Sequence, residues 1–176
     1  MTRPGGILAT PSIRIGGLLC FDLSGTVGFA YGHVGDLMPT FGSWHLSDSS
    51  LLGARYTSFE NELIAAIERF RPRVIIMEAP LPSSAQGTTN VARQQFGLAA
   101  YVEGEAFRAR IQVREVPAST VRKEVLGKGR FASGTAKAAV MAFCKGKGWN
   151  VSDDHQADAL ILWLYSCDVQ RRLGRS

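Results

Sequence analysis

Residues 18–30 read Leu-Leu-Cys-Phe-Asp-Leu-Ser-Gly-Thr-Val-Gly-Phe-Ala, and the predicted topology of the chain starts from them. Leu18–Phe21 is apolar at every position, which is typical of a strand covered on both faces. We expect this first strand over Ile15–Ser24, then a tight Ser-Gly turn and a second strand over Val27–His33. A third strand over Thr40–Leu46 would complete an antiparallel meander.

Helices and strands alternate after the meander. Apolar side chains recur at helical spacing before Pro72, which ends that helix. The expected elements are a helix from near Leu51 to Phe70, a strand over Arg73–Glu78, a loop over Leu81–Asn90, a helix capped by Thr89 or Asn90 and ending near Arg108, a strand over Ile111–Val116, and helices over Ala118–Leu126, Thr135–Lys145 and Asp154–Arg172. The order predicts an α/β fold with a mixed five-stranded sheet flanked by helices.

The composition is that of an ordinary globular chain of 176 residues, 45% hydrophobic and 20% charged. We expect residues 15–176 to form a single domain and residues 1–14, with two prolines and a Gly pair, to be a flexible extension. Neither a bilayer-spanning run nor a signal peptide is recognised. Cys20, Cys144 and Cys167 lie in apolar stretches, as buried thiols in a reducing cytosol do, so we expect a cytoplasmic protein with no membrane partner.

Positive charge is concentrated between Val121 and Lys147. The basic residues there, against the single acid Glu124, are Arg122, Lys123, Lys128, Arg130, Lys137, Lys145 and Lys147. Such a segment suits a polyanion such as nucleic acid, with contacts to the backbone that are largely independent of sequence. It is equally consistent with a solvated helical face. Arg93, close to the expected Leu81–Asn90 loop, is a further candidate for nucleic-acid binding.

Three acids stand where a charge is costly. Asp22 lies at the end of an apolar strand, Glu78 ends the strand Val-Ile-Ile-Met-Glu, and Asp158 lies in the first turn of an almost wholly apolar helix. Three such elements can meet at one edge of the sheet, where open α/β sheets bind ligands. Each acid also has an ordinary structural explanation: a turn hydrogen bond for Asp22, a strand end in water for Glu78, and the helix dipole for Asp158.

A cluster of carboxylates repels itself, and a divalent cation removes that repulsion. Oxygen ligands without a Cys or His cluster favour Mg²⁺ or Mn²⁺ over zinc. The expected chemistry is phosphodiester hydrolysis with two ions roughly 3.5–4 Å apart, one activating water and the other stabilising the leaving oxygen.

The last helix offers a further ligand, because Asp154 and His155 each share a face with Asp158. Charge favours Asp154 for Mg²⁺, whereas an imidazole suits Mn²⁺. His155 is alternatively a proton donor or acceptor near the water, or simply an exposed residue in the first helical turn. Ser152 or Asp153 is expected to cap the helix, and Asp153 is expected to do so rather than to bind metal.

Three stretches resemble RuvC-type Holliday-junction resolvases, particularly the divergent versions carried by phages and prophages. They are Phe21–Ala30, similar to the family's first-strand Asp with its small-residue turn and second strand; Ile75–Glu78, similar to its second acidic strand; and Asp154–Leu160, similar to its helical motif of two metal-binding residues three apart. His155 falls at the first of those two positions, where Asp is common and some members use His.

A fourth stretch, the Val125–Arg130 loop with Lys137 and Val140 downstream, is similar to the family's basic segment, at a longer spacing to the Lys than usual. The resemblance covers about Gly17 to Asp168. It implies a ribonuclease H-like fold, a homodimer, and paired symmetric nicks across a four-way DNA junction. It also implies that the catalytic residues are Asp22, Glu78, His155 and Asp158.

Other functions stay open. Many ribonuclease H-like nucleases cut flaps, forks or RNA–DNA hybrids, and nothing in the residues fixes the geometry of the substrate. The actin-like sugar kinases and ATPases have a similar first phosphate loop, Asp-x-Gly…Gly, but they need two related domains, and this chain lacks a second glycine-rich phosphate motif. A non-catalytic DNA-binding module on the same fold is disfavoured by the presence of all three acids.

Overall fold

The fold is seen in a computed structural model that describes residues 14–80, 89–132 and 134–174. Within these ranges the elements are, in order, β1 (Leu18–Asp22), β2 (Thr26–Gly32), β3 (Thr40–His45), α1 (Leu52–Phe70), β4 (Val74–Glu78), α2 (Thr89–Arg108), β5 (Gln112–Val116), α3 (Ala118–Leu126), α4 (Thr135–Gly146) and α5 (Asp154–Leu173). Their kinds and order are as expected from the sequence. The largest difference is at β1, which begins at Leu18 rather than Ile15.

One local expectation was wrong. Thr89 or Asn90 was expected to cap the helix after the loop, yet both already lie within α2. The last helix, α5, begins at Asp154 as expected, and Asp158 opens its apolar stretch one turn further in. Most of the expected Leu81–Asn90 loop falls outside the described residues, as does the expected N-terminal extension except for Arg14, which pairs with Asp36.

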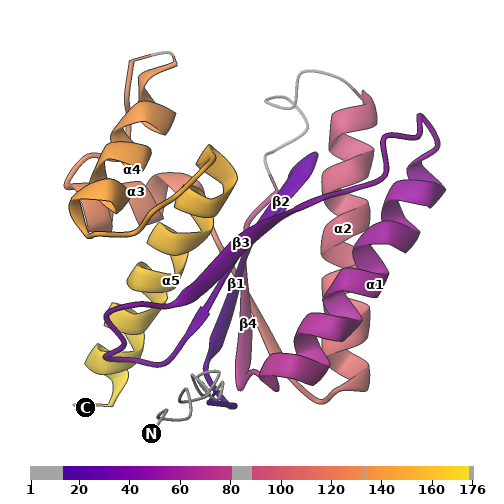
Figure 1. The fold of residues 1–176 in the computed structure, drawn as a ribbon, viewed down its shortest axis with the longest axis horizontal. Helices are drawn as coiled ribbons and strands as arrows, with labels where there is room; N and C mark the ends of the chain where they lie inside the picture. The colour runs from indigo at the N-terminus through magenta and orange to yellow at the C-terminus, as the bar shows by residue number, and fades with distance from the viewer. Residues whose placement is uncertain (1–13, 81–88, 133, 175–176) are drawn as a thin grey trace, which may run out of the picture.

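The sheet has the strand order β3-β2-β1-β4-β5. β1 pairs antiparallel with β2 and β2 with β3, whereas β4 lies parallel to β1 and β5 parallel to β4. Figure 1 shows α1 and α2 on one face of the sheet and α5, with α3 and α4, on the other. Leu18 and Cys20 therefore pack towards α5, while Leu19 and Phe21 pack towards α1 and α2, and all four are buried as the apolar run predicted. The mixed five-stranded sheet is confirmed.

Glycines on β2 let α5 lie directly on the sheet. A Cβ added to Gly28 would stand 2.0 Å from the backbone oxygen of His155, and one added to Gly32 would stand 2.9 Å from the ring of Trp163. The helix begins where Asp153 caps it, accepting a hydrogen bond of 2.8 Å from the backbone N–H of Gln156. The expected cap is thus confirmed, and the first turn of α5 is fixed against β2.

Two properties expected from composition can be compared with the folded chain. Cys20, Cys144 and Cys167 are buried free thiols, as their apolar surroundings predicted. In the described part of the chain, the helices are too short or too polar to span a membrane.

Candidate active site

The three acids meet at one edge of the sheet. Asp22 is the last residue of β1 and Glu78 the last of β4, and these strands are parallel neighbours with Phe21 opposite Met77. Their side chains therefore leave the sheet at the same end. Asp158 approaches from α5, which packs on the same strands, and its side chain is 11% exposed.

The charges of these acids act on one another. Burial, followed by the charges of Asp22 and Asp158, raises the pKa of Glu78 to about 8. Burial and the charge of Asp22 likewise raise the pKa of Asp158 to about 6. Glu78 is thus more than a strand end that reaches water, because an exposed carboxyl would keep its ordinary pKa. The three acids form one electrostatically coupled group, which we call the acidic cluster.

A small hollow lies between two members of the acidic cluster. It holds about 10 Å³, and its lining includes Asp22 and Glu78 together with Leu23, Pro80 and Gln95. That volume is close to the room one water molecule needs. Small ligands rather than a bulky substrate group fit between these two carboxylates.

The oxygen donors of the acidic cluster suit a hard divalent cation. Even so, among the residues described, no three carboxylate, imidazole or thiol groups stand close enough together to hold an ion. Two of the chain's own basic groups, His155 and Arg122, instead lie against Asp22 and Asp158. Metal binding by Asp22, Glu78, Asp154, His155 and Asp158 therefore stays a prediction.

His155 is tied to the acidic cluster through one ring nitrogen. Its Nδ1 lies 2.9 Å from Oδ2 of Asp22 and 3.0 Å from Oγ of Ser24. The hydrogen bond with Asp22 raises the pKa of His155, although burial opposes the shift. The side chain is 23% exposed, so the alternative of a merely solvent-exposed histidine does not describe it. Because Nδ1 is engaged, Nε2 is the nitrogen left for other partners.

Asp154 turns towards a lysine instead. Its carboxylate forms a salt bridge with Lys137 of α4. Burial works against it, yet the hydrogen bond from Lys137 lowers the pKa of Asp154. The spacing from the Val125–Arg130 loop to Lys137 is longer than is usual in RuvC-type resolvases. Lys137 nevertheless lies near the site, because its charge also acts on Asp158.

The basic residues expected to bind nucleic acid divide into two groups. Arg122 on α3 is partly buried, and its guanidinium lies 3.7 Å from Asp158. Its Nε has no hydrogen-bond partner among the described residues. By contrast, the exposed basic residues are Arg93, Lys123, Lys128, Arg130, Lys137, Lys145 and Lys147. The structure thus places Arg122 and the exposed Lys137 beside the acids, whereas the other basic residues lie on the surface.

Sequence reasoning missed two polar residues near the site. Ser24 was read only as part of a small-residue turn, yet its hydroxyl reaches His155. Its position two residues after Asp22 was the available signal. Gln94 of α2 is buried and donates from Nε2 to the Ser24 carbonyl oxygen at 3.3 Å. No pattern in the sequence marks that glutamine, because its burial depends on how α2 packs.

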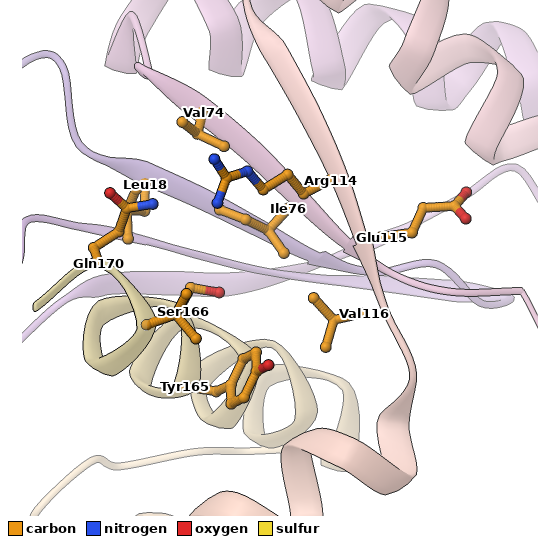
Figure 2. Close-up of a pocket in the computed structure, with 10 residues that line it drawn as sticks. Leu18, Val74, Ile76, Arg114, Glu115, Val116, Tyr165, Ser166 and Gln170 are labelled. Atoms are coloured by element: carbon orange, nitrogen blue, oxygen red, sulfur yellow. The ribbon is translucent and has the colours of Figure 1, made fainter. Parts of the chain in front are cut away.

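A larger cavity of about 170 Å³ lies elsewhere, between α5 and the strands β4 and β5. Figure 2 shows Ile76, Val116, Tyr165 and Ser166 around it, with Arg114 reaching over from β5. None of the predicted site residues is among the described residues that line it. The cavity is separate from the acidic cluster.

No protein-family model matches the chain, and no curated protein matches its sequence. Solved structures do match it. RuvC from Thermus thermophilus matches with a TM-score of 0.67 at 17% identity, over 88% of this chain and 96% of RuvC. The same protein in complex with a Holliday junction substrate gives a TM-score of 0.68 at 18% identity, over 89% and 95% of the two chains. This chain has the RuvC fold.

A second protein of known structure also matches this chain in fold. The yeast mitochondrial Holliday junction resolvase Ydc2 matches with a TM-score of 0.60 at 11% identity, over 93% of this chain and 85% of Ydc2. At these identities the likeness concerns the fold alone. It confirms the ribonuclease H-like architecture that the sequence resemblance implied, whereas the resemblance to phage-borne versions stays a prediction.

Proposed function

We propose that this chain is a structure-specific endonuclease that resolves four-way DNA junctions by metal-dependent phosphodiester hydrolysis. The observation that carries the proposal is the acidic cluster, in which Asp22, Glu78 and Asp158 come together from β1, β4 and α5. Its position at the carboxyl ends of two parallel strands on a RuvC fold supports the same reaction.

The ions proposed here are Mg²⁺ or Mn²⁺, and we assign Asp22, Glu78 and Asp158 to hold them. These carboxylates would have to move closer together around an ion, because as they stand they are too far apart to hold one. Bound there, such ions supply a Lewis acid and a hydroxide at neutral pH. The raised pKa values of Glu78 and Asp158 mean that these carboxyls hold protons more readily than free ones, and a cation must displace those protons.

His155 is a better candidate than Asp154 for the fourth position. Asp22 and Ser24 fix the orientation of the His155 ring and leave Nε2 available as a ligand or a proton acceptor. Asp154 is already neutralised by Lys137. We therefore assign His155 to the reaction and Asp154 to holding Lys137.

The basic residues are proposed to bind the DNA backbone. Lys123, Lys128 and Arg130 on and after α3, together with Arg93 on α2, are exposed and free to meet phosphates. Arg122 and Lys137 stand beside the acidic cluster, where a phosphate about to be cut would approach. A homodimer would present two such sites, as paired symmetric nicks require.

The test is cleavage of an end-labelled four-way junction by the purified chain, with Mg²⁺, with Mn²⁺ and with a chelator. We expect paired nicks in the junction with either metal and none with the chelator. A replication fork, a flap and a linear duplex of the same sequence serve as parallel substrates. Preferential cutting of the fork or the flap would show that this structure, rather than the four-way junction, is the substrate. If none of the substrates is cut, the nuclease assignment is contradicted.

A further inference from the structure

The side chain of Gln94 forms a hydrogen bond with the turn between β1 and β2. This side chain is 9% exposed and comes from the first turns of α2. Its Nε2 donates to the backbone oxygen of Ser24 at 3.3 Å, and its Oε1 accepts from Nη1 of Arg55 at 3.0 Å. Arg55 in turn donates from Nε to the carbonyl of Ser49 at 3.0 Å. Both ends of the Gln94 amide are therefore bonded, one of them to the turn that follows Asp22.

Ser24 links that turn to His155. Its hydroxyl donates to the backbone oxygen of Thr26 at 2.5 Å, which uses the only proton it has. The hydroxyl oxygen that faces Nδ1 of His155 at 3.0 Å is consequently an acceptor. Asp22 presents a second acceptor to the same nitrogen at 2.9 Å. Two oxygens of one short turn thus select the ring form that carries a proton on Nδ1 and leaves Nε2 without one when the ring is neutral.

Packing alone does not explain an amide at position 94. A leucine occupies a similar volume and costs nothing to remove from water, whereas a buried amide must have both halves hydrogen-bonded. What Gln94 provides beyond volume is a donor to the Ser24 carbonyl and an acceptor for Arg55. These two functions can be separated by substitution.

We propose that Gln94 is a positioning residue for cleavage: by holding the Ser24 carbonyl, it fixes the turn whose oxygens orient the ring of His155. The consequence for cleavage rests on the proposed nuclease function, but the orientation of the ring does not. The hydrogen bonds of Gln94 go to Ser24 and Arg55 and not to the acidic cluster.

Three variants separate the roles. Gln94→Glu keeps the size of the side chain and the acceptor for Arg55, but replaces the donor to Ser24 by a repelling oxygen. Gln94→Leu removes both hydrogen bonds, and Ser24→Ala removes the hydroxyl that faces His155. The matched control is Gln170→Leu, which removes a partly exposed amide bonded to Arg73 at 3.4 Å beside the separate cavity of Figure 2.

The direct readout is the nitrogen NMR spectrum of the His155 side chain, recorded without DNA or metal at one pH where the ring is neutral. We expect a single Nδ1-protonated form in the wild type and in Gln170→Leu. In Gln94→Glu and Gln94→Leu, the two ring nitrogens should move towards averaged values. The change should be smaller in Ser24→Ala, because Asp22 still accepts from Nδ1. Single-turnover cleavage should fall by about tenfold or more in Gln94→Glu, with unchanged junction affinity.

A wild-type His155 spectrum in Gln94→Glu would overturn the proposal, and so would wild-type cleavage by that variant. If Gln94→Leu does not fold, Gln94→Glu and Ser24→Ala still decide the question. A wild-type chain that cuts no branched DNA would contradict the proposed function, while the spectrum would still decide whether Gln94 orients the ring.

Discussion

Nδ1 of His155 lies 2.9 Å from the Asp22 carboxylate, although 133 positions separate the two residues in the chain. The contact joins the end of the central strand to the first turn of α5. It brings together the first and the last of the stretches that resemble RuvC-type resolvases. We expect the reactivity of the proposed site to depend on this pair and on the acids around it.

Replacement of Asp22 should separate catalysis from binding. In Asp22→Asn the amide has nearly the same size, but it is a poorer cation ligand and a weaker partner for His155. We expect junction cleavage to fall by more than about a hundredfold, with junction affinity retained. Cleavage and gel-shift assays on the same preparation check this. Near-normal cleavage would remove Asp22 from the mechanism.

The assignment of His155 over Asp154 can be tested with two alanine variants. We expect His155→Ala to lose activity under both metals, and Asp154→Ala to lose less, because Asp154 acts by holding Lys137. If the ring binds metal, wild-type activity should be relatively better with Mn²⁺. Full activity in His155→Ala with loss in Asp154→Ala would exchange the two roles.

The activity of the wild type should also fall at acidic pH. A protonated imidazole can neither bind a metal nor accept a proton. Hydrogen bonding to Asp22 raises the pKa of His155, so the loss of activity should begin above the ordinary value of about 6.5. Measurement of kcat against pH with a saturating junction checks this. An activity that stays constant down to pH values well below that range would argue against a role for His155.

The stability of the metal-free chain should depend on Glu78. Its pKa is raised, by burial first and then by Asp22 and Asp158, from 4.5 to about 8. Below pH 4.5 the carboxyl is protonated in the folded and unfolded states alike, so the stabilising effect of the protonated Glu78 is fully present. Between 4.5 and 8 the unfolded chain releases the proton first, and the free energy of unfolding falls as pH rises.

The substitution Glu78→Gln should remove this dependence of stability on pH. Near pH 8, Glu78→Gln should be more stable than the wild type by on the order of 2 kcal/mol, and the two should be similar near pH 4. Urea unfolding at both values measures the difference. Added Mg²⁺ should stabilise the wild type more than Glu78→Gln at pH 8. Equal pH profiles for the two proteins would mean that Glu78 is not buried against other acids.

A methyl group at Gly28 should displace the first turn of α5. The added Cβ would lie 2.0 Å from the His155 carbonyl oxygen, which belongs to the backbone and has no side-chain freedom to move aside. Gly28→Ala should cost about 1–3 kcal/mol of stability and should reduce cleavage. Gly146→Ala, where a Cβ meets nothing within 4 Å, is the control. Wild-type stability in Gly28→Ala would contradict the packing of α5 on β2.

Binding to DNA should depend on salt through the exposed basic loop after α3. Lys128→Ala with Arg130→Ala should weaken junction binding and lower the slope of log K against log salt by about 2. The charge-matched control is Arg69→Ala with Arg108→Ala, on the helices that cover the other face of the sheet (Figure 1). Equal slopes for the two double variants would show that the loop faces solvent when DNA is bound.

The sequence by itself determined the elements and the identity of the acids. An apolar run such as Leu18–Phe21 predicts a strand that is covered on both faces. The spacing of apolar residues in the later segments distinguishes helices from strands, so the mixed sheet could be predicted from local patterns. The cost of placing Asp22, Glu78 and Asp158 in or beside apolar elements is likewise visible in the sequence. The prediction of a cap at Thr89 or Asn90 failed, because both residues already lie within α2. The residues just before Thr89 lie outside the described structure.

Only the tertiary structure decided which neighbours these residues have. Asp154 and His155 are adjacent in sequence, yet the packing of α5 on Gly28 turns one towards Lys137 and the other towards Asp22. Arg122 belongs to a basic run but lies against Asp158, and Gln94 is buried beneath the turn that carries Ser24. Such contacts join segments far apart in the chain. Their geometry depends on how helices dock on the sheet, which no local pattern of residues specifies.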